Sequence, residues 1–287
     1  MIIGGDRFKV IENIKKNIQN KAFHAKAEIG DPILSQEKSK QLVEHFWKDS
    51  KKYSHKLVNL FTRGAFDLGA LILTLGDKID STKNIKHIPS AIITSNHYNQ
   101  FDSLPIKKLA LKAHKRLFII VEDTNLLLPG WIGFMMKNID SIPLSNSVRY
   151  LGREFPKHLS NAFAKKSWVL IYPEQEMWFN YRKPRPVQKG AYYYAAKLNV
   201  PIISCFVELQ DKSSYEKNHP EFHKTRRILH VLPTIYPDPN LSVDENARRM
   251  RDIDYSQKKK AYEQAYNKKL DYTFSYDDIA GFIPKNR

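Results

Sequence analysis

Short apolar runs alternate with segments of helical spacing through the middle of the chain. The apolar runs have the length of strands and lie at 91–94, 117–122, 139–142, 168–172, 200–209 and 228–235. Helical segments are expected between them, at about 146–166 and 190–198. Strands that alternate with helices are typical of a parallel sheet with helical crossover connections. The pattern therefore predicts an α/β fold with a mixed, mostly parallel sheet flanked by helices.

Both ends of the chain are polar, lysine-rich and helical in their spacing. Apolar residues repeat at helical intervals at Phe8, Ile11 and Ile14, and again at Leu42, Val43, Phe46 and Trp47. Pro32 separates two expected amphipathic helices, because the residue before a proline disfavours helix continuation. A charged helix with solvated lysines at 258–260 is expected at about 243–270. We therefore expect an N-terminal helical appendage at 1–56, a main domain at 57–240, and a C-terminal charged helix and tail at 241–287.

The charge of the chain narrows its possible partners. Its 287 residues include 47 Lys and Arg against 30 Asp and Glu, a formal net charge of +17. Such a charge predicts attraction to a polyanion: anionic lipid headgroups, nucleic acid or phosphorylated substrates. The single cysteine, Cys205, lies in an apolar run, which excludes a disulfide framework and a cysteine-rich metal site. Cys205 is expected to be a small buried hydrophobe.

One stretch of the chain has partly membrane-like character. Residues 57–76 are the most apolar stretch of that length, but Arg63 and Asp67 interrupt it. An interfacial or packed helix is therefore expected there, rather than a spanning one. No secretory signal is visible in residues 1–10, since no apolar core followed by a small-residue cleavage site stands there.

A polar cluster follows the first predicted strand and carries the first candidate chemistry. It reads Ser-Asn-His-Tyr-Asn-Gln-Phe-Asp from position 95 and places His97 and Asp102 five residues apart. Loops at strand ends are where α/β folds present functional groups. A neutral His97 could remove a proton from a hydroxyl while Asp102 holds its tautomer. The alternative is that His97 caps a helix and Asp102 is an ordinary surface residue.

A second cluster combines a carboxylate with several cations. Pro173 and Glu174 close the predicted strand at 168–172, and Arg182, Lys183, Arg185 and Lys189 follow. Arginine side chains suit phosphate, and Lys189-Gly190 at the start of a helix would add backbone donors for an anion. A solvated basic loop is the alternative. The aromatic residues among these cations could instead anchor the protein at a membrane or stack on nucleic acid; they are Trp178, Phe179 and Tyr181.

Together these segments resemble the glycerolipid acyltransferases, the family that includes lysophosphatidic acid acyltransferases. Its Asn-His-x4-Asp motif stands at 96–102, preceded by an apolar strand. Its Phe-Pro-Glu motif and the following Lys-Gly-Ala are similar to 172–174 and 189–191, and its Val-Pro-Ile to 200–202. The order and spacing agree over roughly 88–209.

The resemblance implies a fold, an activity and a set of partners. It implies a glycerol-phosphate acyltransferase-like fold in which His97 is the general base and Asp102 orients it, with no acyl-enzyme. The donor would be acyl-CoA or acyl carrier protein, the acceptor lysophosphatidic acid or a related lysolipid, with neither cofactor nor metal. Asn96, Pro173 and Glu174 would serve acceptor binding, and Glu174 could either hydrogen-bond acceptor hydroxyls or brace the site. The enzyme would act peripherally on an anionic membrane surface, at the cytoplasmic face of the cell membrane.

Two motifs depart from the family pattern. Gln175 and Met177 stand where the third motif has glycine and arginine, and the second motif, read at 139–141, lacks its arginine. We hypothesise that the lost positive charge is supplied by Arg182, Arg185 or Arg149. Alternatively, the acceptor is another lipid or a glycolipid without glycerol phosphate.

Three other functions compete with acyl transfer. A basic nucleic-acid-binding protein fits the charge and the fifteen tyrosines, but it does not account for the joint motif match, so no nucleic-acid partner is expected. A lipid-binding relative without catalysis fits the altered third motif, although such a protein has no chemical need for the His97 and Asp102 pair. Hydrolysis is the third, if water takes the thioester when no acceptor is present.

Overall fold

The computed structural model describes residues 6–30, 32, 34–145 and 147–284. Residues 1–5, Asp31, Ile33, Asn146 and residues 285–287 lie outside the described residues. The expectations for the N-terminal appendage, for the start of the helix at 146–166 and for the C-terminal tail extend onto them.

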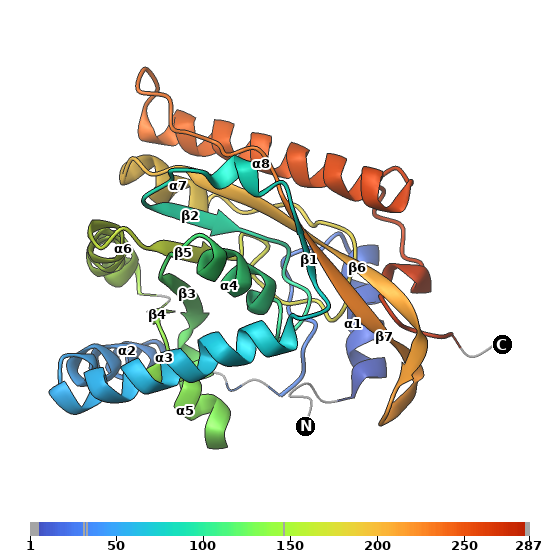
Figure 1. Cartoon of the computed structure of the whole chain (residues 1–287), viewed down its shortest axis with the longest axis horizontal. Coiled ribbons are helices and arrows are strands. Elements are labelled where there is room, and N and C mark those ends of the chain that lie inside the picture. The colour runs from blue at the N-terminus through green and yellow to red at the C-terminus, as the bar shows by residue number, and fades with distance from the viewer. Residues whose placement is uncertain (1–5, 31, 33, 146, 285–287) are drawn as a thin grey trace.

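Seven strands form one sheet in the order β1-β7-β6-β2-β5-β3-β4 (Figure 1). Every neighbouring pair is parallel except β6 and β7, which are antiparallel. The predicted α/β class with a mostly parallel sheet is therefore confirmed. The strands are β1 Lys78–Asp80, β2 Ala91–Thr94, β3 Leu117–Glu122, β4 Ser141–Leu144, β5 Trp168–Ile171, β6 Ile202–Glu216 and β7 His219–Val231.

Helices surround the sheet, and two of them, α4 and α5, were not indicated by the apolar pattern. A π-helical turn at Tyr150–Glu154 leads into α6, and short 3-10 turns lie at Thr82–Ile85, Asp123–Leu127 and Tyr276–Asp278. The α-helices are α1 Arg7–Gln19, α2 Gln36–Ser50, α3 Tyr53–Leu73, α4 Ser103–Lys112, α5 Gly130–Asn138, α6 Phe155–Ala164, α7 Gly190–Lys197 and α8 Val243–Tyr266.

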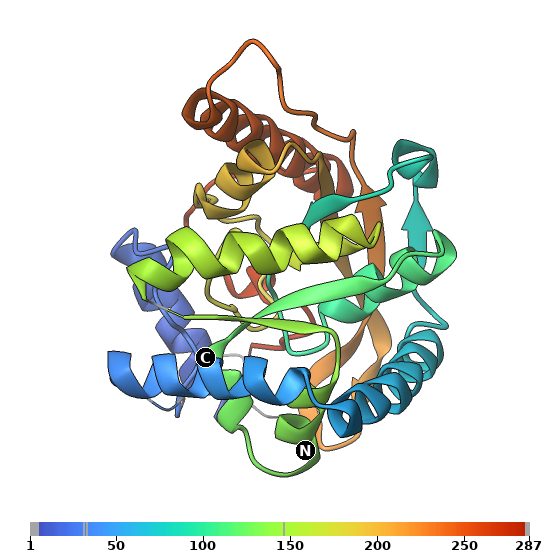
Figure 2. The same cartoon turned by 90° about the vertical axis from the view of Figure 1, so that its left-hand side faces the viewer.

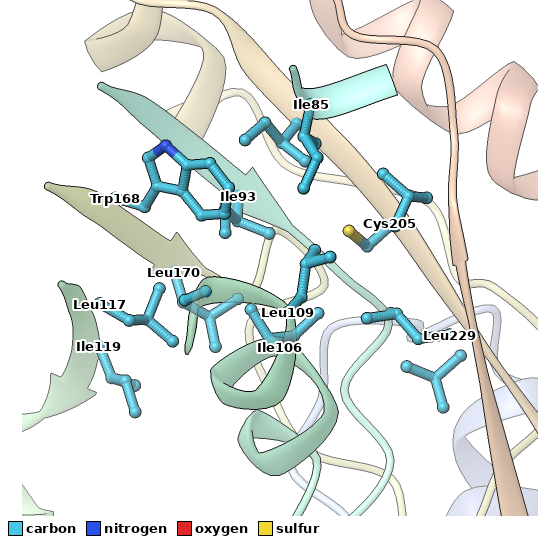
Figure 3. Packing of buried hydrophobic residues seen from close by; sticks show 14 of the residues in the cluster. Ile85, Ile93, Ile106, Leu109, Leu117, Ile119, Trp168, Leu170, Cys205 and Leu229 are labelled. Atoms are coloured by element: carbon cyan, nitrogen blue, oxygen red, sulfur yellow. The ribbon is translucent and has the colours of Figure 1, made fainter. Parts of the chain in front are cut away.

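The sheet separates two apolar layers because successive strand residues point to opposite faces. On one face, Ile93 and Leu170 pack with Ile106 and Leu109 of α4 (Figure 3). Cys205 belongs to the same layer, and burial raises the pKa of its thiol to about 12, so it is the inert buried residue expected. On the other face, β2 packs against α7 and α8, and β4 and β5 against α6. Coverage on both sides explains why these strands are continuous apolar runs.

The two ends of the described chain pack against the same part of the molecule. Val10 and Ile14 of α1 share an apolar cluster with Trp178, Phe222 and Ile279. The C-terminal segment pairs with the chain at two places: Ala280 N–H donates to the Asn180 carbonyl at 2.8 Å, and His223 N–H donates to the Gly281 carbonyl at 2.7 Å. The chain after β5 is therefore enclosed by both ends.

β6 and β7 continue as a long hairpin that apolar periodicity did not reveal. Beyond Leu209 the hairpin is mostly polar and partly exposed, so it offers no apolar run. Its outer part pairs Asp211 with Thr225 and Tyr215 with His223. α1 and the C-terminal segment pack against this outer part of the hairpin.

α3 lies at the opposite end of the molecule from α8 in both views (Figures 1 and 2). It buries only Thr62 and Ala70, and the Asn59 side chain and the Thr62 hydroxyl donate to the Asn138 carbonyl at the end of α5. None of the described helices is long and apolar enough to cross a membrane.

Gly281 is a position where the fold requires glycine. Its φ is +80°, and a methyl group there would overlap the His223 carbonyl oxygen. We expect Gly281→Ala to lower the free energy of unfolding by about 1–3 kcal/mol through backbone strain alone, and more through the overlap. Gly64→Ala, on α3 with open space around it, should instead raise it by up to ~1 kcal/mol. Denaturant unfolding measures both, and equal effects would contradict the assigned close approach.

Candidate active site

The loop after β2 brings His97 and Asp102 to the carboxyl edge of the sheet. β2 ends at Thr94, the chain crosses the edge, and Asp102 stands at the N-terminus of α4. In open α/β sheets this edge is where ligands bind. The side chain of His97 keeps 21% of its exposure, while that of Asp102 keeps 5%. The imidazole is therefore accessible and its carboxylate partner is not.

Hydrogen bonds to both oxygens of Asp102 fix the direction of the His97 ring. His97 Nδ1 lies 2.5 Å from Asp102 Oδ2, which also accepts the Tyr98 N–H at 3.2 Å. The Tyr172 hydroxyl donates to Oδ1 at 2.5 Å. A proton on Nδ1 is thereby favoured, which leaves Nε2 as the nitrogen that can accept one. Asp102 makes no side-chain cap hydrogen bond to α4 and is buried, so it is not an ordinary surface residue.

Tyr172 also belongs to this site, although the motif match at 172–174 assigned it no role. Its ring stacks on the imidazole of His97, with centroids 4.0 Å apart and planes 10° apart. Burial, followed by the charge of Asp102, raises the pKa of Tyr172 well above its ordinary value. The hydroxyl therefore keeps its proton and donates to Asp102. The sequence signal for it is its place in the motif match, directly after β5 and before Pro173.

Glu174 holds the backbone of His97 through a hydrogen bond. It is 2% exposed, and its Oε2 accepts the His97 N–H at 3.2 Å. Arg185 compensates the buried charge: its own N–H donates to Oε1 at 3.0 Å and its guanidinium lies 3.1 Å from Oε2. Burial lowers the pKa of Arg185, and the Glu174 carboxylate opposes that shift. The pair joins the loops that follow β2 and β5.

The connection between α1 and α2 covers this pair. The Phe23 carbonyl accepts from Arg185 Nη1 at 2.9 Å, and the Ala25 carbonyl accepts from Trp178 Nε1 at 2.9 Å. The Trp178 ring lies 4.4 Å from the guanidinium carbon of Arg185. Nothing in the sequence of this connection indicated a place at the site.

Asn96 ties the same loop to β6. Its side-chain amide donates to the Val207 carbonyl at 3.0 Å and its side-chain oxygen accepts the Val207 N–H at 2.8 Å. It is 1% exposed. The two bonds extend the pairing of β2 with β6 beyond Thr94. Asn96 and Glu174, expected to serve acceptor binding, are thus placed beneath the site, where they hold the loop.

Comparison with known proteins shows which family contains a similar site region. Residues 78–208, which include both site loops, match the family model described as Acyltransferase. Residues 78–208 therefore form an acyltransferase domain. A search of curated proteins finds no match. Among solved structures, the chain is similar to the 1-acyl-sn-glycerophosphate (LPA) acyltransferase PlsC from Thermotoga maritima. The identity is 15% and the TM-score 0.48, with 92% of this chain and 98% of that chain covered.

The cations expected to serve this acyltransferase differ in their availability. Arg182 pairs with Asp211 at 2.6 Å and also donates to the Leu209 carbonyl. Arg185 is enclosed with Glu174, and Lys189, next to Gly190 at the start of α7, pairs with Asp244. Arg149 is exposed, and its side chain has neither a hydrogen bond nor an ion pair to another described residue.

The segment read as the second motif does not lie at the site. Residues 139–141 stand at the amino end of β4, at the opposite edge of the sheet from His97. Asp140 is 4% exposed there and binds the Arg116 guanidinium at 2.5 and 2.7 Å. The equivalence was wrong for a topological reason: in a parallel strand, only residues after the carboxyl end reach this edge. The chain reaches it at Ser145.

In the third motif, Gln175 has the left-handed backbone conformation that a glycine at this position would readily adopt. Gln175 adopts a left-handed φ of +68° at the position where the family pattern has glycine. The Pro173 carbonyl accepts the Gln188 N–H at 2.8 Å, which closes the loop that leads to α7. No cluster of three or more histidine, cysteine or acidic side chains that could hold a metal ion occurs in the described part of the chain.

The Glu174–Arg185 pair gives a stability prediction. We expect Arg185→Leu to lower the free energy of unfolding by about 3–5 kcal/mol, because it leaves the buried Glu174 carboxylate unpaired. The double variant Glu174→Leu with Arg185→Leu should lose less than Arg185→Leu alone, since no buried charge remains. Denaturant unfolding of the three variants measures this coupling. Additive losses would show that the two side chains do not compensate each other.

Proposed function

We propose that this acyltransferase moves a fatty acyl group from a thioester to the hydroxyl of a lysolipid, with His97 as general base. The thioester is acyl-CoA or acyl carrier protein, and the acceptor is lysophosphatidic acid or a related lysolipid. The observation that carries the proposal is the His97–Asp102 pair, in which Asp102 occupies Nδ1 and leaves Nε2 for a substrate proton. The match of residues 78–208 to the acyltransferase family supports the reaction class.

The proposed reaction is direct transfer. The acceptor hydroxyl oxygen attacks the thioester carbonyl carbon while Nε2 of His97 takes the hydroxyl proton. The carbon–oxygen bond forms, the carbon–sulfur bond breaks, and the proton passes from His97 to the departing thiolate. Asp102 stabilises the imidazolium that forms in between. Tyr172 keeps Asp102 in place by donating to its second oxygen.

Recognition of a charged acceptor is assigned to Arg149. Arg182 and Arg185 are held by carboxylates, whereas Arg149 is exposed beyond the carboxyl end of β4. A guanidinium without a protein partner can offer its forked donors to phosphate oxygens.

The exposed face of α3 supports action at a membrane surface. Its spacing places a row of large apolar side chains on one side of the helix, where they stay exposed: Leu57, Leu60, Phe61, Leu68, Leu71 and Ile72. Trp131 and Phe134 of the adjacent α5 are also exposed. Apolar patches of this kind mark interaction sites. The net charge of +17 complements anionic lipid.

This apolar face is connected to the catalytic loop. Arg227 donates to the Leu73 carbonyl at the end of α3 at 2.8 Å, and to the Phe101 carbonyl at 3.4 Å. Phe101, half exposed, directly precedes Asp102. A bilayer that meets α3 would therefore lie near the loop that must receive a lipid. We propose peripheral binding to the cytoplasmic face of the cell membrane.

The function is tested by product formation. Purified protein is incubated with labelled acyl-CoA or acyl carrier protein and a panel of lysophospholipid and glycolipid acceptors. We expect labelled lipid from the wild type, and a loss of about 10²–10⁴-fold in kcat for His97→Ala, because the hydroxyl loses its base. His114→Ala, on a turn outside the site, is the matched control. Equal activity of His97→Ala and wild type would reject His97 as the base.

Membrane docking is tested separately by flotation with vesicles that contain anionic lipid. We expect Phe61→Asp with Leu68→Asp to reduce the bound fraction strongly, since each substitution places a charge in the apolar row. Val243→Asp, at the start of α8 on the far side of the molecule, should leave binding unchanged. Undiminished flotation of the α3 variant would exclude this face as the docking surface.

A further inference from the structure

A buried ion pair on α8 contacts the last residue of β2. Asp254 and Lys258 are fully buried, and Asp254 Oδ2 lies 2.5 Å from Lys258 Nζ. The Thr94 hydroxyl donates to Asp254 Oδ2 at 2.9 Å and accepts from Lys258 Nζ at 2.9 Å. The Tyr192 hydroxyl of α7 donates to the same carboxylate oxygen. The expectation that Lys258 is solvated was therefore wrong: α8 turns this side chain into the protein, and only its neighbours at 259–260 stay exposed.

Such a pair is an unusual choice for a core. Removing two charges from water costs several kcal/mol per ion before their attraction compensates, and apolar replacements of buried pairs are often neutral or stabilising. α7, α8 and β2 also contribute to an apolar cluster that includes Ile92, Ala195 and Met250, so apolar replacements would have apolar neighbours. Stability alone therefore does not explain Asp254 and Lys258.

The position of the pair suggests what it supplies. Thr94 stands three residues before His97, at the point where the chain leaves the sheet. Asn96 binds Val207 of β6, so the loop is already attached on one side. The Thr94 hydroxyl adds hydrogen bonds to Asp254 and Lys258 of α8, and Asp254 in turn accepts from Tyr192 of α7. Apolar contacts would fill the same space without specifying direction.

We propose that Asp254 and Lys258 are positioning residues, which act through Thr94 to hold the loop that carries His97. This rests on the proposed function of His97. Neither residue touches substrate, so their loss would lower kcat by displacing His97 and leave KM almost unchanged. Misplacement of a catalytic group by about 1 Å costs up to 10²-fold in rate. We expect a loss of about ten-fold, because Asn96 and Glu174 still hold the loop.

The test compares Thr94→Val, which removes the hydroxyl, with Thr94→Ser, which keeps it. The double variant Asp254→Leu with Lys258→Met removes both charges, and Lys259→Met is the exposed control on the same helix. Each is measured for thermal unfolding, for kcat and KM, and for amide hydrogen exchange of residues 95–102. We expect Thr94→Val and the double variant to stay folded, lose kcat about ten-fold and exchange faster in this loop. Thr94→Ser and Lys259→Met should match the wild type.

The outcomes separate this inference from the proposed function. If Thr94→Val and the double variant are folded and keep both kcat and loop exchange, the pair is merely structural and the inference is overturned. If the wild type shows no transfer that depends on His97, the proposed function fails. Loop exchange then still decides whether Asp254 and Lys258 hold the loop. If the double variant unfolds, Thr94→Val against Thr94→Ser gives the answer.

Discussion

One buried carboxylate, Glu174, holds the site loops together, and much of the surrounding structure follows from the need to compensate it. Its oxygens accept the backbone N–H groups of His97 and Arg185. A charge that is 2% exposed needs a partner, which is the Arg185 guanidinium. That guanidinium in turn needs acceptors for its remaining donors, and finds them in the carbonyls of Phe23 and Glu176. A series of hydrogen bonds therefore runs from His97 through Glu174 and Arg185 to Phe23, in the connection between α1 and α2.

The same requirement explains why the two chain ends lie where they do. The Phe23 carbonyl can reach Arg185 only because α1 packs beside the segment after β5. That segment also contains Lys183, which is 1% exposed and pairs with Asp278 near the C-terminus at 2.8 Å. Arg185 and Lys183 are therefore each bound by a residue from a distant part of the chain. The parts that flank residues 78–208 thus supply contacts to the segment between β5 and α7 that contains Glu174 and Arg185.

Sequence reasoning succeeded where the signal is local. The apolar runs at 91–94 and 117–122 coincide with β2 and β3, since a strand buried on both faces leaves a continuous apolar record. His97 and Asp102 were also recognisable, because both lie within one loop and six residues of sequence. Tyr172 was within reach by the same logic, as the last residue before the Pro173 turn.

It failed where a charged or polar residue is buried by distant partners. Lys258, Lys183 and Arg185 resemble solvated side chains in sequence, and only three-dimensional neighbours reveal them as enclosed. The outer part of the β6–β7 hairpin has the same difficulty, because its strands are stabilised by backbone pairing without an apolar face. The misplaced second motif shows a further limit. Spacing alone does not tell which end of a strand carries a residue.

Several charged side chains at the carboxyl edge of the sheet are paired with other groups of the protein. At the carboxyl edge, Glu174 pairs with Arg185 and Arg182 pairs with Asp211, while Asp102 is hydrogen-bonded to His97 and Tyr172. The unpaired surplus that makes the net charge +17 therefore lies mostly outside the site, where water screens it and a lipid surface can meet it. An anionic surface would therefore be attracted by the outer side chains as a whole. Because Asp102 occupies Nδ1, the nitrogen that faces a substrate proton is Nε2, and this assignment depends on the hydrogen bonds of the loop rather than on the charge of the outer surface.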